Sequence, residues 1–367
     1  MEFVSFQSIG EQAWDLFCIE NDEAWFRHTA TWLEYTCNMR ENGASRNMSF
    51  GVVDHGKLIA IVPLIMEAIH RAPALSEFGF AGWNVPFPAL ARGLGEKHRD
   101  KIGKEIFQEI DRLANVHEVS YAAFEVNPLI TVPERTVFAC NPLPFLGFTS
   151  TDIATHIIGL DDGEDTLLRR MRKGHKSDIT AGLNNNYIVR LFDSASIDVR
   201  AFDTYRSLHL HAAGRQTRPD KTWRIMYEWV RNGFAVLAIL EHKKEIPIAA
   251  ALSIVYKDAA YYGSGCVEPD FVNERGVMHV LLWETMRFLK LKMIRWFETG
   301  WQHTPTLSQE VPSQKEVNIS HFKRGFGGMN VPYYRGEKFY NYCYMEEAFQ
   351  NRLRQFKTEW LDKEHRE

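Results

Sequence analysis

The sequence is poor in cysteine and has no cysteine pair of the kind that binds zinc or builds a disulfide framework. Its 367 residues include five cysteines, an odd number, and none of them form a CxxC spacing. Structural zinc sites and disulfide scaffolds need clustered or evenly paired cysteines. We therefore expect reduced thiols, no metal site and a cytoplasmic location.

Long hydrophobic runs are also missing. The longest, Leu58 to Met66, has nine residues, whereas about 20 are needed to cross a bilayer. The first ten residues, MEFVSFQSIG, carry an acid early and show no basic stretch followed by an apolar one. We therefore expect neither a signal peptide nor a transmembrane segment.

Neither sign of charge dominates the chain. Lys and Arg number 43 against 47 Asp and Glu, which gives a net charge of −4. Such a protein has no general attraction for polyanions, so we expect no DNA partner, and any phosphate binding must come from a local basic group. The sequence also lacks a P-loop, a dinucleotide-binding fingerprint and an HExxH motif.

The composition is that of a globular protein with a real core. Hydrophobic residues make up 45% and aromatic residues 13%, and a chain of this length suggests two domains. Apolar periodicity predicts helices over 21–39, 96–115, 165–182, 199–213, 221–231, 276–291 and 345–367. Alternating or continuous apolar runs predict hairpins over 51–66 and 234–256, and strands over 119–126, 187–192, 259–266 and 294–298.

The two predicted hairpins resemble each other. GVVDHGKLIAIVPLIM and AILEHKKEIPIAAALSIV both place an acid-His-x-Lys turn between apolar strands. A hairpin, then a helix, then a strand follow in each half, which suggests a divergent internal duplication and, in each half, a mixed sheet flanked by helices. We expect a first lobe over 1–160, a second over 161–344, and a C-terminal helix over 345–367. The apolar stripe of that helix, which we expect to pack on the body, comprises Phe349, Leu353, Phe356 and Trp360.

Several segments resemble the FemAB-type aminoacyltransferases. They are LLRRMRKGHKSDITAG, IAAALSIVYKDAAYYGSG, GVMHVLLWETMRFLKLK, IRWFETG and HFKRGFGG, in that order. The Phe-Lys-x-x-Phe-Gly element, here Phe322 to Gly327, is the most specific piece. The resemblance covers about 160–342 well and the first half only in its hairpin and general order. It implies an α/β fold of two tandem lobes related to the GCN5-related acetyltransferases (GNAT).

The same resemblance implies an acyltransferase that moves an acyl or aminoacyl group from an activated ester or thioester to an amine. It implies no permanently bound cofactor: the acyl donor is a co-substrate, either aminoacyl-tRNA or acyl-CoA. The acceptor would be a small or nucleotide-linked molecule of cell-envelope, polysaccharide or small-molecule biosynthesis, with tRNA as a candidate partner. The alternative is a non-catalytic protein of this fold that binds a phosphorylated glycan or tRNA.

The glycine-rich pyrophosphate motif of CoA-dependent relatives is incomplete here. In those relatives, backbone amides at a helix N-terminus hold the pyrophosphate. The counterparts are residues 273–278 (NERGVM) and 92–97 (RGLGEK), which keep a glycine and lose the terminal small residue. The departure favours the aminoacyltransferase branch over conventional CoA binding.

Lys323 and Glu298 are the candidate catalytic residues. Lys323, in the family element, is either a point charge on a phosphate or developing oxyanion, or an exposed lysine at a helix end. Glu298 follows a buried strand, where burial can raise the pKa of a carboxyl and suit it to a base; the alternative is a structural carboxylate. No Ser-His or Cys-His pairing supports an acyl-enzyme, so we expect direct transfer, with strand amides and Lys323 stabilising the oxyanion.

The remaining candidates are substrate-binding residues. A basic segment is either a solvated helix face or a phosphate clamp, because guanidinium groups pair bidentately with phosphate. It comprises Arg169, Arg170, Arg172, Lys173 and Lys176. Tyr256, Tyr261 and Tyr262 are core residues by default, although one of them could donate a proton to the leaving group. His303 is either an auxiliary base or a surface residue.

Overall fold

The computed structural model describes residues 1–40, 44–69, 75–130, 138–185, 187–242 and 246–362. Contacts divide the chain into two compact units. The first unit comprises Met1–Ala154, His303–Asn318 and Val331–Glu367, and the second comprises Thr155–Gln302 and Ile319–Asn330. The chain therefore returns to the first unit twice, whereas the sequence predicts one crossing near residue 160.

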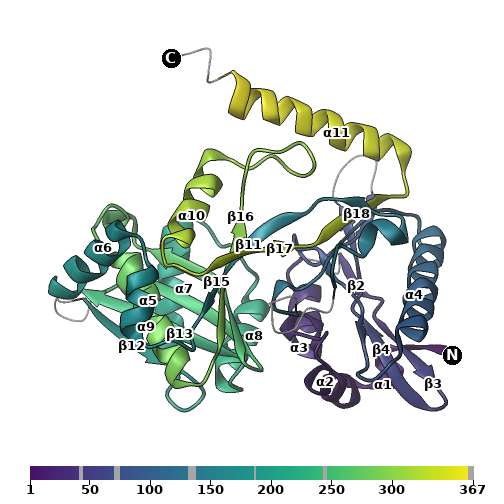
Figure 1. The fold of residues 1–367 in the computed structure, drawn as a ribbon, viewed down its shortest axis with the longest axis horizontal. Helices are drawn as coiled ribbons and strands as arrows, with labels where there is room; N and C mark the ends of the chain where they lie inside the picture. Colours follow the sequence, from purple (N-terminus) through teal and green to yellow (C-terminus); the bar gives the residue numbers. More distant parts are fainter. Residues whose placement is uncertain (41–43, 70–74, 131–137, 186, 243–245, 363–367) are drawn as a thin grey trace. The chain divides into compact units, whose positions relative to one another are not determined.

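The chain combines runs of consecutive strands, such as β2 to β8, with helices before and after them (Figure 1). Up to residue 159 they are β1 Glu2–Ser5, α1 Phe6–Ile9, α2 Glu11–Glu20, α3 Ala30–Cys37, β2 Ser45–Asn47, β3 Phe50–Asp54, β4 Lys57–Val62, β5 Ile65–Ile69, β6 Leu75–Phe78, β7 Val85–Pro86, β8 Ala89–Leu90, α4 Glu96–Val116, β9 Val119–Glu125, β10 Thr149–Ser150 and β11 Ile153–Gly159. After it they are α5 Glu164–Arg170, α6 Lys173–Asn184, β12 Ile188–Phe192, α7 Val199–Ala213, α8 Asp220–Arg231, β13 Ala235–His242, β14 Ile246–Tyr256, β15 Ala259–Val267, α9 Val277–Leu291, β16 Trp296–Gln302, α10 Gln314–Arg324, β17 Met329–Tyr333, β18 Arg335–Phe339 and α11 Tyr342–Phe356.

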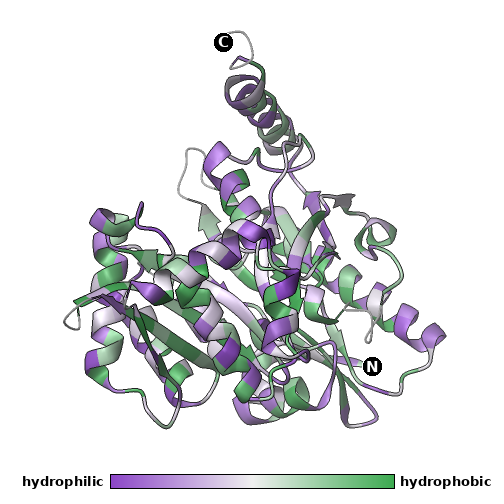
Figure 2. Cartoon of the chain, turned by 60° about the vertical axis from the view of Figure 1, so that its left-hand side comes forward, coloured by the Kyte–Doolittle hydropathy of each residue, from purple (hydrophilic) through white to green (hydrophobic). Residues whose placement is uncertain are grey.

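The second unit is built on a seven-stranded mixed sheet in the order β12-β13-β14-β15-β16-β11-β17. Strands β12 to β15 are antiparallel neighbours, whereas β15 and β16 are parallel. Val236, Ala238 and Leu240 of β13 pack with side chains of α9. Because alternate residues of a strand face opposite sides, the buried residues between them face the side where α8 contacts β13. The strands are mainly hydrophobic and the helices mix both kinds of residue (Figure 2).

The first unit holds two sheets because the strands of its hairpin are interrupted. His55 and Gly56 both have positive φ angles, 47° and 76°, as a two-residue type I′ hairpin turn requires. This hairpin, β3–β4, lies in the sheet β1-β3-β4-β8, whereas β2 and β5 lie in the sheet β10-β18-β9-β6-β5-β2. Pro63, which has no N–H to donate, separates β4 from β5. The prediction of mixed sheets with flanking helices is confirmed.

The predicted basic helix over 165–182 is in fact two helices. Met171 and Arg172, between α5 and α6, have extended ψ angles of 152° and 147°. The Arg172 N–H donates to the Gly325 carbonyl at 2.9 Å instead of continuing the helix. A tertiary hydrogen bond therefore divides the basic segment, which periodicity alone does not reveal.

The chain near the N-terminus also differs from expectation. The sequence predicts one helix over 21–39, whereas α3 begins only at Ala30, where the Thr29 side chain accepts from the Trp32 N–H. Helix α2, over Glu11–Glu20, was missed because only Trp14, Phe17 and Cys18 of it are buried. Three buried positions make a weak apolar stripe.

The C-terminal helix buries a charge more fully than its predicted apolar stripe. Phe349 and Leu353 of α11 are 43% and 46% exposed, whereas Arg352 is 8% exposed. The Arg352 guanidinium donates to both oxygens of Glu337 on β18, at 2.7 and 2.6 Å. The predicted stripe packs on the body in part: the Phe349 ring centroid lies 6.0 Å from that of Phe339 on β18, and the Trp360 Nε1 donates to the Pro312 carbonyl at 3.1 Å, whereas Leu353 is exposed.

No helix in the described part of the chain is long and apolar enough to cross a membrane.

Candidate functional site

The parallel strands β15 and β16 separate part of the way along. Their ladder pairs Ala259 with Trp296, Ala260 with Phe297, and Tyr261 with Glu298. Beyond Tyr261 and Glu298, the described residues of the two strands no longer pair with each other, although β15 runs to Val267 and β16 to Gln302. Backbone groups of both strands are therefore left without ladder partners on the facing side.

A bulge in β15 lies at the start of this strand opening. Leu252 of β14 pairs with Ser264, and the next residue, Ser253, pairs with Tyr262, so Gly263 has no opposite residue. Bulges of this kind interrupt a ladder and are common beside active sites. Bulge and opening together place backbone groups of β15 that lie outside the β15–β16 ladder at one point of the sheet.

Lys323, near the end of α10, reaches this strand opening. Its Nζ lies 5.8 Å from the ring centroid of Tyr262 on β15. A Cβ added to Gly300 of β16 would stand only 2.8 Å from the same nitrogen, and the Gly300 φ of +104° is one that L side chains rarely adopt. Gly300 therefore makes room for the Lys323 side chain between the two strands.

Burial perturbs the Lys323 ammonium. Desolvation lowers the pKa of Lys323 from 10.5 to about 8, and the nearby Glu298 carboxylate opposes this shift only in part. The group is therefore mostly cationic near neutral pH and loses its proton readily. A cation held in such a place can neutralise a developing oxyanion or a phosphate.

Glu298 lies within β16, not at its end as the sequence predicts, because the strand continues to Gln302. The Glu298 side chain is 4% exposed, and its Oε1 accepts a hydrogen bond of 2.7 Å from the Thr155 hydroxyl. A buried carboxylate bonded in this way is held in one orientation. The structure brings Glu298 and Lys323 together, and it adds Thr155, a residue that the sequence analysis missed.

The three candidate tyrosines occupy different places. Tyr262 faces Lys323, whereas Tyr256 pairs with Ala259 at the end where β14 turns into β15, and its ring contacts Phe234. Tyr256 is therefore away from the strand opening. Burial raises the pKa of the Tyr262 phenol, so that hydroxyl keeps its proton.

The turn after α10 is closely packed, which fixes the helix end that carries Lys323. The His175 Nε2 lies 2.8 Å from the Phe322 carbonyl, and a Cβ on Gly325 would stand 1.9 Å from the His175 ring. His175 and His279 form an edge-to-face pair at 4.6 Å, and Phe322 packs on both. Burial lowers the pKa of His279 to about 4 and that of His175 below its usual value, so both rings are neutral.

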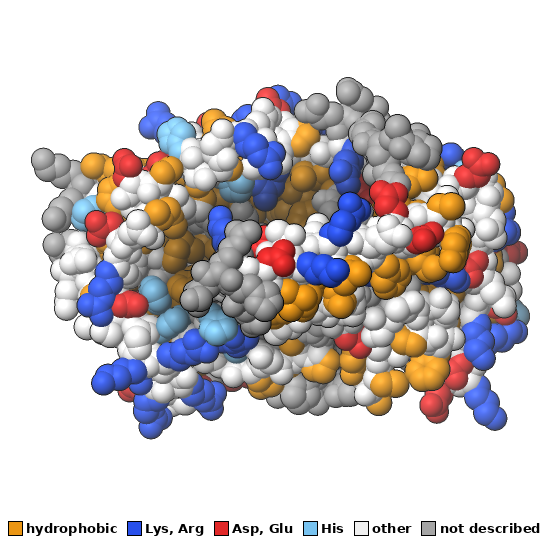
Figure 3. Space-filling model, turned by 90° about the horizontal axis from the view of Figure 1, so that it is seen from above, with side chains coloured by type: hydrophobic (Ala, Val, Ile, Leu, Met, Phe, Trp, Pro, Cys, Tyr) orange, Lys and Arg blue, Asp and Glu red, His pale blue; other side chains and the backbone are white. Residues whose placement is uncertain are grey.

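The basic segment does not form a single surface of free cations. Arg170 pairs with Asp162 at 2.5 Å, and the Arg172 guanidinium donates to the His321 carbonyl of α10 at 3.2 Å. Arg169 and Lys173 are exposed, and Lys176 is half-buried, in the last turn of α5 and the first turns of α6. Over the face seen from above, basic and acidic side chains are interspersed (Figure 3). Arg170 and Arg172 therefore already contact other parts of the chain, although both remain exposed.

Helix α6 covers the N-terminal turn of α9, where the incomplete glycine motif lies. The Arg275 side chain donates to Asp178 and Ser177 of α6, in both cases at 2.6 Å. A Cβ on Gly276 would stand 2.5 Å from the Asp178 carbonyl oxygen and 3.0 Å from the Gly182 Cα. Helix α6 therefore lies directly against Gly276 and Arg275 of this turn.

The first unit has a similar parallel pair, β6 and β9, but no comparable opening. Their ladder ends at Phe78 and Ala122. Farther along β9, the short strand β7 takes over and pairs Val85 with Phe124 and Pro86 with Glu125. Among the described parallel pairs, β15–β16 in the second unit is therefore the better candidate for a reaction site.

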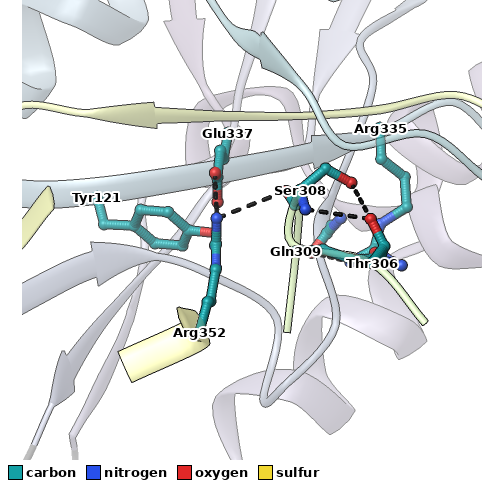
Figure 4. A network of polar contacts seen from close by, with 8 residues as sticks. Tyr121, Thr306, Ser308, Gln309, Arg335, Glu337 and Arg352 are labelled. Carbon is teal, nitrogen blue, oxygen red and sulfur yellow. Dashed lines mark hydrogen bonds and ion pairs between the residues drawn. The ribbon is translucent and has the colours of Figure 1, made fainter. Parts of the chain in front are cut away.

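The segment that follows β16 is held within the first unit. The Arg352 guanidinium donates to the Ser308 carbonyl, and the Arg335 guanidinium donates to Gln309 at 3.0 Å (Figure 4). His303, at the start of this segment, lies near Glu316. Burial acts to raise the pKa of Glu316, but hydrogen bonds from Ser313 and the nearby His303 leave it below its usual value. His303 thus lies toward the N-terminal end of α10, whereas Lys323 lies toward its C-terminal end.

Other clusters of titratable residues are weaker candidates for a functional site than the strand opening. His209 and His211 of α7 bind different partners, Arg218 at 2.9 Å and Glu268 at 2.9 Å, as side chains two residues apart on a helix must. A hollow of about 450 Å³ is lined in part by His211 and Glu268, which are hydrogen-bonded to each other. The described residues include no group of three or more His, Cys, Asp or Glu arranged to hold a metal ion.

Comparison with known proteins identifies the class of fold. Residues 165–306 match the family model of the acetyltransferase (GNAT) domain. The structure of FemX is similar over 95% of this chain and 100% of that one, with a TM-score of 0.65 and 12% identity. The structure of L-PGS from Bacillus licheniformis is similar over 94% and 96%, with a TM-score of 0.56 and 11% identity. A search of curated protein sequences finds no match.

Residues 165–306 therefore match a GNAT acetyltransferase domain, and the chain as a whole has a fold like that of FemX. The resemblance noted from the sequence is confirmed at the level of fold.

Proposed function

We propose that the protein transfers an acyl or aminoacyl group to an amine acceptor at the strand opening of β15 and β16. The observation that carries the proposal is Lys323: a desolvated cation placed beside strand groups outside the β15–β16 ladder and a buried carboxylate, within a GNAT-type fold. Oriented amides and a fixed charge stabilise the oxyanion of acyl transfer.

The reaction would proceed in one displacement. The acceptor amine gives a proton to Glu298 or to a bound water, and its nitrogen then attacks the donor carbonyl carbon. The β15 amides outside that ladder and the Lys323 ammonium stabilise the oxyanion. A C–N bond forms, the C–O or C–S bond to the donor breaks, and the leaving oxygen or sulfur takes up a proton.

The proposed donor is an aminoacyl ester such as aminoacyl-tRNA rather than acyl-CoA. Helix α6 lies on the α9 turn that would hold a CoA pyrophosphate, and Arg275 already pairs with Asp178. The exposed cations Arg169 and Lys173, with Lys176, would instead contact phosphates of a nucleotide-linked substrate. The acceptor would belong to cytoplasmic steps of cell-envelope, polysaccharide or small-molecule biosynthesis.

A binding protein without turnover is the second candidate. It is favoured by the burial of Glu298, which with its Thr155 hydrogen bond also suits a structural carboxylate. Such a protein would retain a phosphorylated glycan or tRNA and release no acyl product.

The test follows transfer of labelled amino acids from charged tRNA, and of acetyl from acetyl-CoA, to a panel of amines. We expect transfer from the ester donor, reduced by about one to three orders of magnitude in Lys323→Met. Glu298→Gln should lower turnover by about 10²–10⁴-fold with donor binding retained if Glu298 is the base. Full activity of a folded Lys323→Met variant, or transfer from acetyl-CoA alone, would contradict the proposal.

A further inference from the structure

We propose that His156 is a positioning residue that anchors the turn after α10 and so sets where Lys323 stands at the strand opening. The effect of this anchor on catalysis rests on the proposed function, whereas the anchoring of the turn by His156 does not. His156 lies in β11, a strand between β16 and β17 in the sheet, and it is 4% exposed.

Both nitrogens of the His156 ring contact the segment that follows Lys323. Its Nε2 lies 2.5 Å from the Gly327 carbonyl oxygen, and its Nδ1 lies 2.8 Å from the Asn330 side chain. A carbonyl oxygen only accepts, so Nε2 carries a proton and donates it. The ring therefore holds the turn at two points, three residues apart.

The turn lies directly on β11, which makes the anchor short and stiff. A Cβ on Gly328 would stand 2.4 Å from the Ile157 carbonyl oxygen, and Gly327 and Gly328 both have positive φ, 81° and 96°. Lys323 is four residues before Gly327, and its own Nζ is held by no hydrogen bond among the described residues. The position of its helix end therefore sets the position of its charge.

Adjacent residues of β11 bind the two halves of the candidate site. Successive side chains of a strand point to opposite faces, so Thr155 donates to Glu298 while His156 holds the turn of Lys323. The His156 carbonyl also accepts from the Thr299 hydroxyl of β16 at 3.2 Å. One strand thus fixes the carboxylate and the ammonium relative to each other.

The test measures the reactivity of Lys323 rather than catalysis. The protein is acetylated with trace acetic anhydride over a pH series, and mass spectrometry quantifies labelling of the peptide that contains Lys323, with Lys357 as an internal reference. The wild-type midpoint should lie at about 8. A looser turn admits water to the amine and moves the midpoint toward the ordinary 10.5.

Two conservative variants separate the contacts. His156→Gln puts an amide donor near the place of Nε2 and keeps the bond to Gly327, so its midpoint should stay close to 8. His156→Asn reaches only the place of Nδ1, so its midpoint should rise. If His156→Asn does not fold, Asn330→Ala, at an exposed position, should give a smaller rise. The matched control is His242→Gln, whose ring packs on Tyr187 and Phe271 and whose replacement should change nothing.

An unchanged midpoint in folded His156→Asn, or equal shifts in the Gln and Asn variants, would overturn the proposal, as would an ordinary midpoint in the wild type. Labelling needs no substrate. Absence of acyl transfer would therefore refute the proposed function and leave this test intact.

Discussion

The Lys323 ammonium illustrates how a single residue of the candidate site is held in an unfavourable place. Water is largely excluded from it, one carboxylate is near, and the depressed pKa records that the folded chain binds its proton less tightly than the unfolded chain does. Gly300 makes room for this placement, since a Cβ there would stand 2.8 Å from Nζ and its φ of +104° suits glycine.

Lys323→Met should therefore stabilise the protein while impairing turnover. A shift from 10.5 to about 8, at about 1.4 kcal/mol per unit and discounted for partial exposure, predicts a gain of about 1–3 kcal/mol at pH 7. Between pH 8 and 10.5 the unfolded chain holds more protons, so wild-type stability rises with pH across that window. The gain of the variant should be fully present below pH 8 and fade toward pH 10.5.

Urea unfolding at several pH values measures this difference. The control is Lys357→Met at an exposed position, which should change stability by less than about 0.5 kcal/mol at every pH. A less stable Lys323→Met at pH 7, or a gain independent of pH, would show that the ammonium is not held against a desolvation cost.

Among the elements, α11 is attached to the first unit through a charge. Arg352 and Glu337 have side chains only 9% and 2% exposed, and the Glu337 carboxylate also accepts from the Tyr121 hydroxyl at 3.2 Å. A buried pair of this kind contributes little against apolar replacements, yet breaking it leaves an uncompensated charge. The same guanidinium contacts the Ser308 carbonyl, so α11 and the segment before α10 depend on one residue (Figure 4).

Arg352→Met should lower the free energy of unfolding by about 3–5 kcal/mol, because Glu337 is left buried and unpaired. Adding Glu337→Gln should recover part of the loss, since the amide oxygen still accepts from Tyr121 and no charge remains. Arg354→Met, at an exposed position of the same helix, serves as the control. Thermal unfolding and limited proteolysis of α11 measure the effect; equal losses in the single and double variants would show that the charge is not the cause.

For the whole molecule, charge limits how a polyanion can bind. The net charge is −4, and both basic and acidic groups occur on the face seen in Figure 3. Long-range attraction is therefore weak, and the phosphate recognition that we propose would come from a few residues of α5 and α6. Their contribution should appear in the salt dependence of binding and not in a general affinity for nucleic acid.

Replacing Lys173 and Lys176 by Gln should weaken tRNA binding and flatten its dependence on salt. Each phosphate contact contributes about 0.7 to the slope of log K against log salt for single strands, so both together should remove about 1.4. The control replaces Lys101 and Lys104 of α4, which are exposed as Lys173 is. Filter binding of deacylated tRNA at several salt concentrations gives the slopes. An unchanged slope would show that the basic residues of α6 form a solvated helix face and do not bind phosphate.

Local chemistry explains which parts of the fold could be predicted. The span of α7 is Val199–Ala213, as its periodicity predicts, and the type I′ turn at His55-Gly56 follows from its residues. The element order, the two-lobed fold class and the family resemblance also depend on patterns among residues that are close in the sequence.

The features of the fold and of the candidate site that the sequence did not predict depend on contacts between residues that are distant in the chain. The break at Met171 depends on the Gly325 carbonyl, and the burial of Arg352 depends on Glu337. Lys323 and Glu298 stood out in the sequence, but Thr155 and His156 did not, although they are a polar pair inside an apolar strand. Thr155 and His156 gain their contacts only because β11 lies between β16 and β17 in the folded sheet. Hydrogen bonds and desolvation depend on distance in space and not on separation along the chain.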